Sequence, residues 1–277
     1  MNIKTVMVHM ELGQASERLA TFAADLAGRL GAVSVIGIAG CQPVQLVYEE
    51  TYVAGEIMAA DREQIEAELK EAEQRFRDAF KARVKRLEWR SDITPGALAD
   101  YIASEARAAD LLISGPDIGG SIFDHARQVK IADLVFKAGR PVIIVPRGCD
   151  HLDLSHVLIG WKDTAECRRA LASALPLLAL AGRISVLSII SEERKDQAEK
   201  QVADVVQWLA RHGLEAAGET HVLNGDDTLA FERLVQEKAP GLVVAGAYGH
   251  SRLREWVLGG VTCDFLIDPD RPVLLSH

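Results

Sequence analysis

The chain has 277 residues, of which 48% are hydrophobic and 26% charged, so it can form about two ordinary domains and is too apolar to be disordered. It has 31 Lys and Arg against 40 Asp and Glu, a net charge of -9, and no dense basic stripe, so nucleic acid and acidic membrane surfaces are not expected partners. Its longest apolar runs are far shorter than the roughly 20 residues of a membrane helix. We therefore expect a soluble protein.

The remaining composition predicts a cytoplasmic protein without a metal centre. The N-terminal residues enter an apolar segment at once and lack the basic region, apolar core and cleavage site of a signal peptide. The 4 cysteines are widely scattered and form no C-x-x-C pair, which favours reduced thiols over disulfides or a zinc site. No histidine lies in a metal-ligand pattern.

The chain contains one pattern twice. Residues 109–115 match residues 240–246, and the same offset places residues 139–144 on residues 270–275, a strand with its entry turn. The N-terminal segments of the two halves, Val6–Met10 and Val157–Trp161, also correspond. We place the boundary near residues 147–155 and expect two domains, residues 1–149 and 150–277.

Each half is expected to alternate strands and helices. In the first half, strands are predicted at residues 5–10, 33–39, 111–114 and 142–145. Its helices are predicted at residues 19–30, 65–87 and 98–108, with a further helix before the last strand. In the second half, strands are predicted at residues 157–160, 184–190, 219–223, 242–245 and 273–275, and helices at residues 167–180, 196–212 and 229–238. Apolar strands separated by helices indicate a doubly wound, Rossmann-like α/β unit with a parallel sheet covered on both faces.

A glycine pattern follows the strand at residues 242–245, where a ligand is expected. Doubly wound sheets bind ligands beyond the carboxyl ends of their strands, where strand order reverses. The pattern is G-x2-G-x9-G-G-x-T, with its glycines at Gly246, Gly249, Gly259 and Gly260. The first two would permit positive φ and bring backbone N–H groups close to phosphate oxygens, and the last two would open a helix whose N-terminus attracts anions. The pattern therefore predicts a polyphosphate site.

Neighbouring side chains suit the same site, although a purely structural interpretation is open. Ser251 and Thr262 would add hydroxyl groups, and His250 and Arg252 would add positive charge. Alternatively, the glycines only form a turn and a helix cap around a short helix at residues 251–258.

The repeat supplies an internal control. Gly115 is the counterpart of Gly246, but the other three glycines are replaced in the first half by Ile118, Gln128 and Val129. A β-branched residue does not readily adopt the positive φ of a phosphate nest, so the first half should lack the site. Because one copy does without these glycines, they are not needed merely to fold the unit.

At these residues the sequence resembles the universal stress protein family, and specifically its tandem members. The likeness covers essentially the whole chain and includes the family's nucleotide-binding signature at Gly246, Gly249 and Gly259. The resemblance implies two five-stranded parallel sheets of order 3-2-1-4-5, which pair through their last strands as an intrachain pseudo-dimer. It also implies an adenine nucleotide, usually ATP, between the first and fourth strands.

The resemblance also assigns residues to that nucleotide. Phosphates and ribose would be held after Ala245 by Gly246, Gly249, Gly259, Gly260, Val261 and Thr262. The nucleoside pocket would be lined by Gly160, Trp161 and Lys162, with Ile189 or Ile190 against the base. Two positions depart from the family: Gly260 stands where Ser or Thr is common, and Lys162 where Asp is common. Asp163 could replace that Asp, and Lys162 could either pair with phosphate or point to solvent.

Three functions from different classes remain open. There is no G-x-x-x-x-G-K-[ST] loop and no G-x-S-x-G elbow, so turnover is expected to be slow or absent. Asp163, Asp226, Asp227 and His250 could position Mg²⁺ or water, but residues 224–228 also fit a turn leading into a helix cap. The hypotheses are a nucleotide-binding stress regulator with an unidentified protein partner, a nucleotide-free interaction scaffold, and a weak ATPase. Homodimerisation beyond the pseudo-dimer stays open.

Overall fold

Strands and helices alternate within each half of the described chain, and the last strand of the first half is followed directly by the first strand of the second. A computed structural model describes residues 2–12, 16–43, 51–81, 83–116, 128–222, 227–247 and 270–277. The first-half strands are β1 (Thr5–His9), β2 (Ser34–Cys41), β3 (Arg86–Ile93), β4 (Leu111–Ser114) and β5 (Val142–Ile144). The second-half strands are β6 (Val157–Gly160), β7 (Ile184–Ile190), β8 (Ala217–Val222), β9 (Leu242–Gly246) and β10 (Val273–Ser276). The helices are α1 (Glu17–Leu30), α2 (Thr51–Phe80), α3 (Leu98–Glu105), α4 (Ile131–Lys137), α5 (Ala165–Leu178), α6 (Lys195–Arg211) and α7 (Asp227–Lys238).

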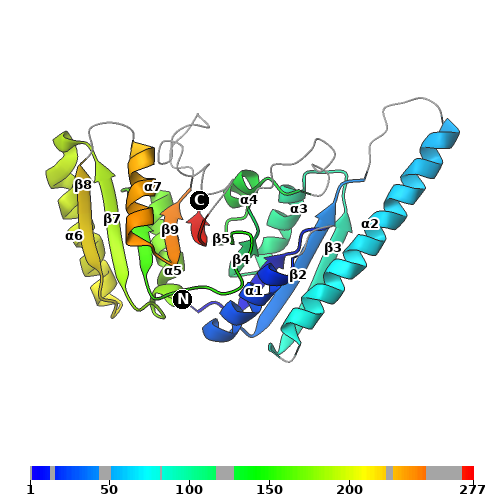
Figure 1. Cartoon of the computed structure of the whole chain (residues 1–277), viewed down its shortest axis with the longest axis horizontal. Helices are drawn as coiled ribbons and strands as arrows, with labels where there is room; N and C mark the ends of the chain where they lie inside the picture. Colours follow the sequence, from blue (N-terminus) through cyan, green and yellow to red (C-terminus); the bar gives the residue numbers. More distant parts are fainter. Residues whose placement is uncertain are drawn as a thin grey trace.

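The strands form one continuous 10-stranded sheet in the order β3-β2-β1-β4-β5-β10-β9-β6-β7-β8. Each half is parallel and has the 3-2-1-4-5 order that the resemblance implies. The halves meet where β5 pairs with β10 in antiparallel register, with Leu274 opposite Ile143. Figure 1 shows these two strands at the centre, with α2 and α6 toward the two ends of the molecule. The predicted doubly wound fold is confirmed, and the two expected sheets are joined into one.

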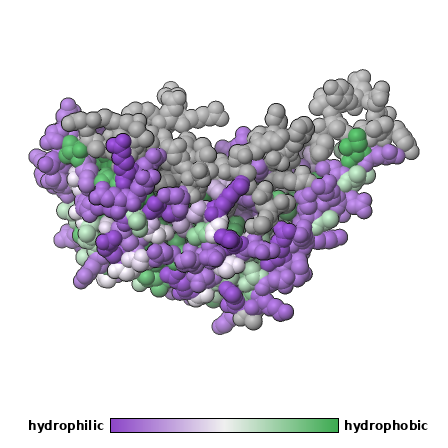
Figure 2. Space-filling model, viewed as in Figure 1, coloured by the Kyte–Doolittle hydropathy of each residue, from purple (hydrophilic) through white to green (hydrophobic). Residues whose placement is uncertain are grey.

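Helices cover both faces of the sheet. One hydrophobic cluster contains the buried residues of α1, α2, α5 and α6, and the other contains those of α3, α4 and α7. Strand residues alternate between the clusters, as Val6 and Val8 on one face and Met7 on the other illustrate. The surface in Figure 2 is mostly hydrophilic, with scattered apolar side chains. Among the described residues, no helix is long and apolar enough to cross a membrane.

The structure corrects one predicted element. We expected the long amphipathic helix to continue through Val84 and Leu87, but α2 ends at Phe80 and β3 follows. The burial of this edge strand alternates only in part: Leu87 and Trp89 pack on the core and Glu88 is exposed, but Arg90 is also partly buried. Charged residues on the open face of an edge strand hide its apolar alternation, so the pattern resembles a helix with one solvated side.

Candidate functional site

Small residues meet at the predicted switch point of the second half. There β6 lies between β7 and β9, and Gly160 is in register with Ala245. Gly246 ends β9 one residue later. The position of a Cβ on Gly160 lies 3.0 Å from Cζ of Phe231, a buried residue of α7. The carboxyl ends of β6 and β9 therefore lack large side chains of their own, and the Phe231 ring packs beside them.

The predicted nucleoside residues divide between the two faces of the sheet. Ala245 and Ile189 pack with the α7 cluster, on the side of Phe231, whereas Trp161 belongs to the α5 and α6 cluster. The Trp161 backbone N–H donates to the Leu187 carbonyl oxygen at 2.7 Å, which fixes this side of the strand end. Ile190 is half-buried at the end of β7. The Trp161 indole therefore does not share a face with Ala245 and Ile189.

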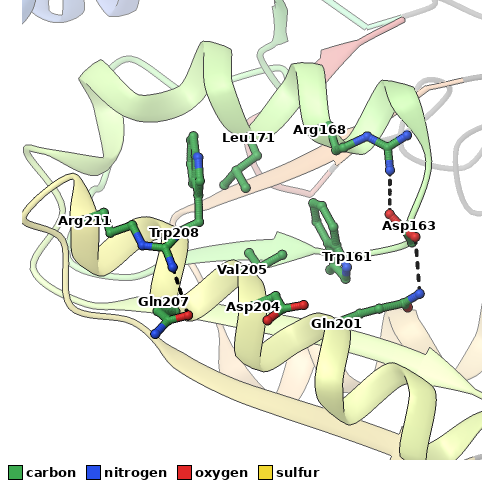
Figure 3. Close-up of a pocket in the computed structure, with 10 residues that line it drawn as sticks. All are labelled: Trp161, Asp163, Arg168, Leu171, Gln201, Asp204, Val205, Gln207, Trp208 and Arg211. Atoms are coloured by element: carbon green, nitrogen blue, oxygen red, sulfur yellow. Dashed lines mark hydrogen bonds and ion pairs between the residues drawn. The ribbon is translucent and has the colours of Figure 1, made fainter.

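Lys162 and Asp163 are both exposed, but only the Asp163 carboxylate is engaged by protein in the described structure. One of its oxygens accepts a hydrogen bond from Arg168 Nη1 at 2.5 Å, and the other accepts one from Gln201 Nε2 at 3.2 Å. Both donors lie on the α5 and α6 side (Figure 3). The next residue, Thr164, caps α5 by accepting from the Cys167 backbone N–H at 3.3 Å. The loop after β6 is thus directed toward α5 rather than toward β9.

The backbone conformation of Gly246 differs from the one that we predicted. Positive φ was predicted here, but the described glycines with positive φ are Gly31, Gly139, Gly148 and Gly213. Gly246 instead lies in β9, where an added Cβ would come within 2.4 Å of the Cys167 backbone nitrogen. The missing side chain lets the first turn of α5 approach the strand. This position therefore requires glycine for helix–strand packing, without any appeal to a phosphate nest.

The repeat offers a matched test of this packing. Gly246→Ala should lower the free energy of unfolding by about 3 kcal/mol, since its Cβ meets rigid backbone. Gly115→Ala should cost less than about 1 kcal/mol, because its Cβ would be 2.7 Å from Glu11 Oε1, the far end of a flexible side chain. Urea unfolding of both variants measures the difference. Equal losses would show that the α5 contact does not govern Gly246.

The first half fills its own switch point with a polar pair. His9 and Ser114 occupy the positions that Gly160 and Ala245 hold in the second half. Their side chains are hydrogen-bonded between Nδ1 and Oγ at 3.0 Å, and both residues are buried. The sequence comparison of the two glycine patterns missed this pair, although the repeat alignment itself contains the signal. The structural difference between the copies thus begins at the strand ends.

Burial lowers the pKa of His9 from its ordinary value of 6.5 to about 4. The unfolded chain therefore binds the proton more tightly than the folded chain. Above pH 6.5, His9 is neutral in the folded and unfolded chain and does not reduce the free energy of unfolding. As pH falls from 6.5 toward 4, the free energy of unfolding decreases, because only the unfolded chain takes up the proton.

We predict that this group removes about 2 kcal/mol of stability between pH 7.5 and pH 5. A His9→Gln variant should lose correspondingly less over the same interval, because Gln does not titrate. Urea unfolding at the two pH values, in both proteins, measures the difference. Carboxylates and the other histidines titrate in both proteins and cancel in this comparison, so identical pH dependence would exclude His9 as the cause.

The remaining site predictions lie outside the described residues. These are Gly249, His250, Arg252, Gly259, Gly260, Val261 and Thr262, together with Asp226. In the described part of the chain, no group of three His, Cys, Asp or Glu side chains could hold a metal ion.

Comparisons with known proteins identify the architecture. No protein-family model matches the sequence. Universal stress protein Slr1230 from Synechocystis sp. is 28% identical over 138 residues, which are 49% of this chain and 46% of that protein. The chain thus matches about half the length of this curated relative. The crystal structure of a universal stress protein from Archaeoglobus fulgidus covers 99% of this chain and 96% of its own, with a TM-score of 0.73 at 16% identity. The chain has the tandem universal stress protein fold.

The resemblance to universal stress proteins is therefore confirmed in both sequence and fold. A shorter universal stress protein from Archaeoglobus fulgidus, in complex with dAMP, covers 52% of this chain and 98% of its own at 19% identity. Its TM-score against the whole chain is 0.34, so its bound dAMP describes that protein and is not transferred to this chain.

Proposed function

We propose that this chain is a tandem universal stress protein that binds an adenine nucleotide, ATP or AMP, in its second domain, residues 150–277. The observation that carries the proposal is the difference between the two switch points. Gly160 and Ala245 leave the carboxyl ends of β6 and β9 without large side chains, whereas His9 and Ser114 close the same place in residues 1–149. Together with the glycine pattern, this asymmetry supports one nucleotide site and one degenerate copy.

The phosphate-binding N–H groups in this proposal come from residues beyond Ala247. The Ala247 backbone N–H already donates to the Ser276 carbonyl oxygen at 2.9 Å, within the ladder between β9 and β10. Gly246 is extended against α5. The donors are therefore assigned to Gly249, Gly259, Gly260 and the residues that follow, with Thr262 supplying a hydroxyl.

Charged groups near the site suit binding better than turnover. Lys162 is exposed at the strand end and can approach a phosphate as a point charge. Asp163 would have to leave Arg168 and Gln201 to reach a cation on the phosphates. Mg²⁺ would thus have to be held mainly by the nucleotide and by residues other than Asp163. We assign a regulatory role in the cytoplasm, in which the nucleotide is held without rapid hydrolysis.

Occupancy of this site has a physical route to the other half of the protein. Ala247, at the exit of β9, accepts a hydrogen bond from the ring of His277 through its carbonyl oxygen, at 3.0 Å from Nδ1. The His277 ring also lies 4.4 Å from the Phe136 ring of α4, measured between centroids. A change at the start of the nucleotide loop therefore reaches the first domain through two contacts. We propose that this route lets the nucleotide alter the surface offered to a protein partner.

We predict that Gly259→Val abolishes stabilisation by nucleotide. Binding at one hundred times Kd should stabilise the parent protein by about 2.7 kcal/mol, because only the folded state has the site. The measurement is thermal unfolding with ATP, ADP and AMP, with and without Mg²⁺. The matched control is Gln128→Val at the equivalent position of the first domain, which should respond to nucleotide as the parent does.

The same titration separates the alternatives. An equal response in the parent and in Gly259→Val would contradict the proposed site. Failure of every nucleotide to stabilise the parent would favour the nucleotide-free scaffold. Phosphate release from ATP by the parent, lost in Gly249→Val, would instead identify a weak ATPase.

A further inference from the structure

A groove between α5 and α6 forms a second candidate site in the second domain. Its cavity measures about 480 Å³, within the range of small-molecule sites. Figure 3 shows α5 on one side and α6 on the other, with side chains of both helices directed into the space between them. The groove lies on the sheet face opposite Ala245 and Phe231, although Trp161 and Asp163, which line it, are also among the residues that the family resemblance assigns to the nucleotide.

The interior of the groove is apolar and aromatic. Trp161, Leu171, Val205 and Trp208 line it, and the Trp208 ring is held against the His212 ring with their centroids 4.3 Å apart. Two indoles and two aliphatic side chains offer flat surfaces on which a planar ring can stack. The groove thus combines an aromatic and aliphatic interior with polar side chains that can orient a small organic molecule.

The polar rim carries no net charge. Asp163 and Arg168 form an ion pair at one end, and Arg211 donates to Gln207 Oε1 at 3.1 Å at the other. Asp204 lies between them on α6 and balances Arg211 (Figure 3). With two cations and two anions around the groove, the rim favours an uncharged ligand that can both donate and accept hydrogen bonds.

The indole nitrogen of Trp161 is the decisive feature. Within the described chain, Trp161 Nε1 is the one buried side-chain nitrogen or oxygen that lacks a hydrogen-bond partner. A buried donor without a partner is unfavourable, so a ligand that supplies an acceptor to this nitrogen gains affinity from the new hydrogen bond. Trp161 is 6% exposed, and Figure 3 shows its nitrogen turned toward α6, beside Gln201 and Asp204.

We propose that this groove binds a small uncharged heteroaromatic molecule, whose ring nitrogen or carbonyl oxygen accepts a hydrogen bond from Trp161 Nε1. The Gln201 side chain lies beside that nitrogen (Figure 3) and donates to Asp163 Oδ2 at 3.2 Å in an exposed hydrogen bond. In this proposal the Gln201 side chain rotates to admit the acceptor. The ring then stacks along Trp161 and Trp208, and its outer edge faces the neutral rim.

The test compares quinoline with naphthalene, which has the same shape but no acceptor. The probe is the indole N–H resonance of Trp161 in ¹⁵N-labelled protein, assigned by its loss in Trp161→Phe. Quinoline should move this resonance downfield, and naphthalene should not. Quinoline should also bind about tenfold more tightly than naphthalene, the factor expected for one buried hydrogen bond, and Trp161→Phe should abolish this preference.

Two controls make the outcome decisive. The Trp89 indole of β3, in the first domain, should stay unchanged throughout. Saturating ATP should leave quinoline binding intact, whether or not ATP itself binds, so failure of the nucleotide site is distinguishable from failure of the groove. The proposal is overturned if quinoline leaves the Trp161 resonance in place, if both probes bind equally, or if ATP displaces quinoline. If Trp161→Phe does not fold, the Trp161 resonance is assigned by elimination from Trp89→Phe, Trp208→Phe and Trp256→Phe, and the titration of the parent still decides these points.

Discussion

The antiparallel pairing of β5 with β10 is the contact on which the two-domain arrangement depends. It joins Ile143 and Ile144 to Leu274 and Val273, all of them buried. Alone, each half would expose its last strand as an open edge with apolar side chains on both faces, a template for aggregation. Paired, the two edges disappear and one core continues from the first half into the second. The candidate nucleotide site then lies one strand away from this junction, because β9 pairs with β10.

The two copies differ in the side chains at two equivalent positions, near the carboxyl ends of their first and fourth strands. In the first, the buried His9 and Ser114 side chains form a hydrogen bond with each other at the strand ends. In the second, glycine and alanine leave these positions small, and Phe231 and α5 approach the strands closely. A buried polar pair must be fully hydrogen-bonded, and the His9 and Ser114 side chains meet that requirement for each other. The same fold therefore accommodates a buried polar pair in one copy and close packing of a ring and a helix against small residues in the other.

Much of this architecture could be predicted because it follows from local patterns and their repetition. The internal repeat and the apolar runs located every strand except β3, and the family resemblance implied the strand order. The predictions that were wrong concerned features determined by residues distant in the sequence. The need for glycine at 246 comes from the backbone of Cys167, which no local pattern reveals. The sequence of the edge strand β3 shows no clear apolar alternation, because only its residues Leu87, Trp89 and Ile93 pack against the core. The face that Trp161 occupies follows from strand register, which the sequence does not specify to one residue.

Gly160 and Trp161 are consecutive, yet they serve opposite faces of β6, so the two proposed sites share one short stretch of backbone. That stretch is held at both ends: the Trp161 N–H donates to Leu187, and Thr164 caps the first turn of α5. Coupling between two sites requires an element with two arrangements that both ligands bias. A segment fixed by these hydrogen bonds has one arrangement, whereas the Gln201 side chain can rotate without moving the backbone. In our proposal the groove therefore opens and closes while the strand end beside the proposed nucleotide site stays in place, so the two proposed sites would act independently.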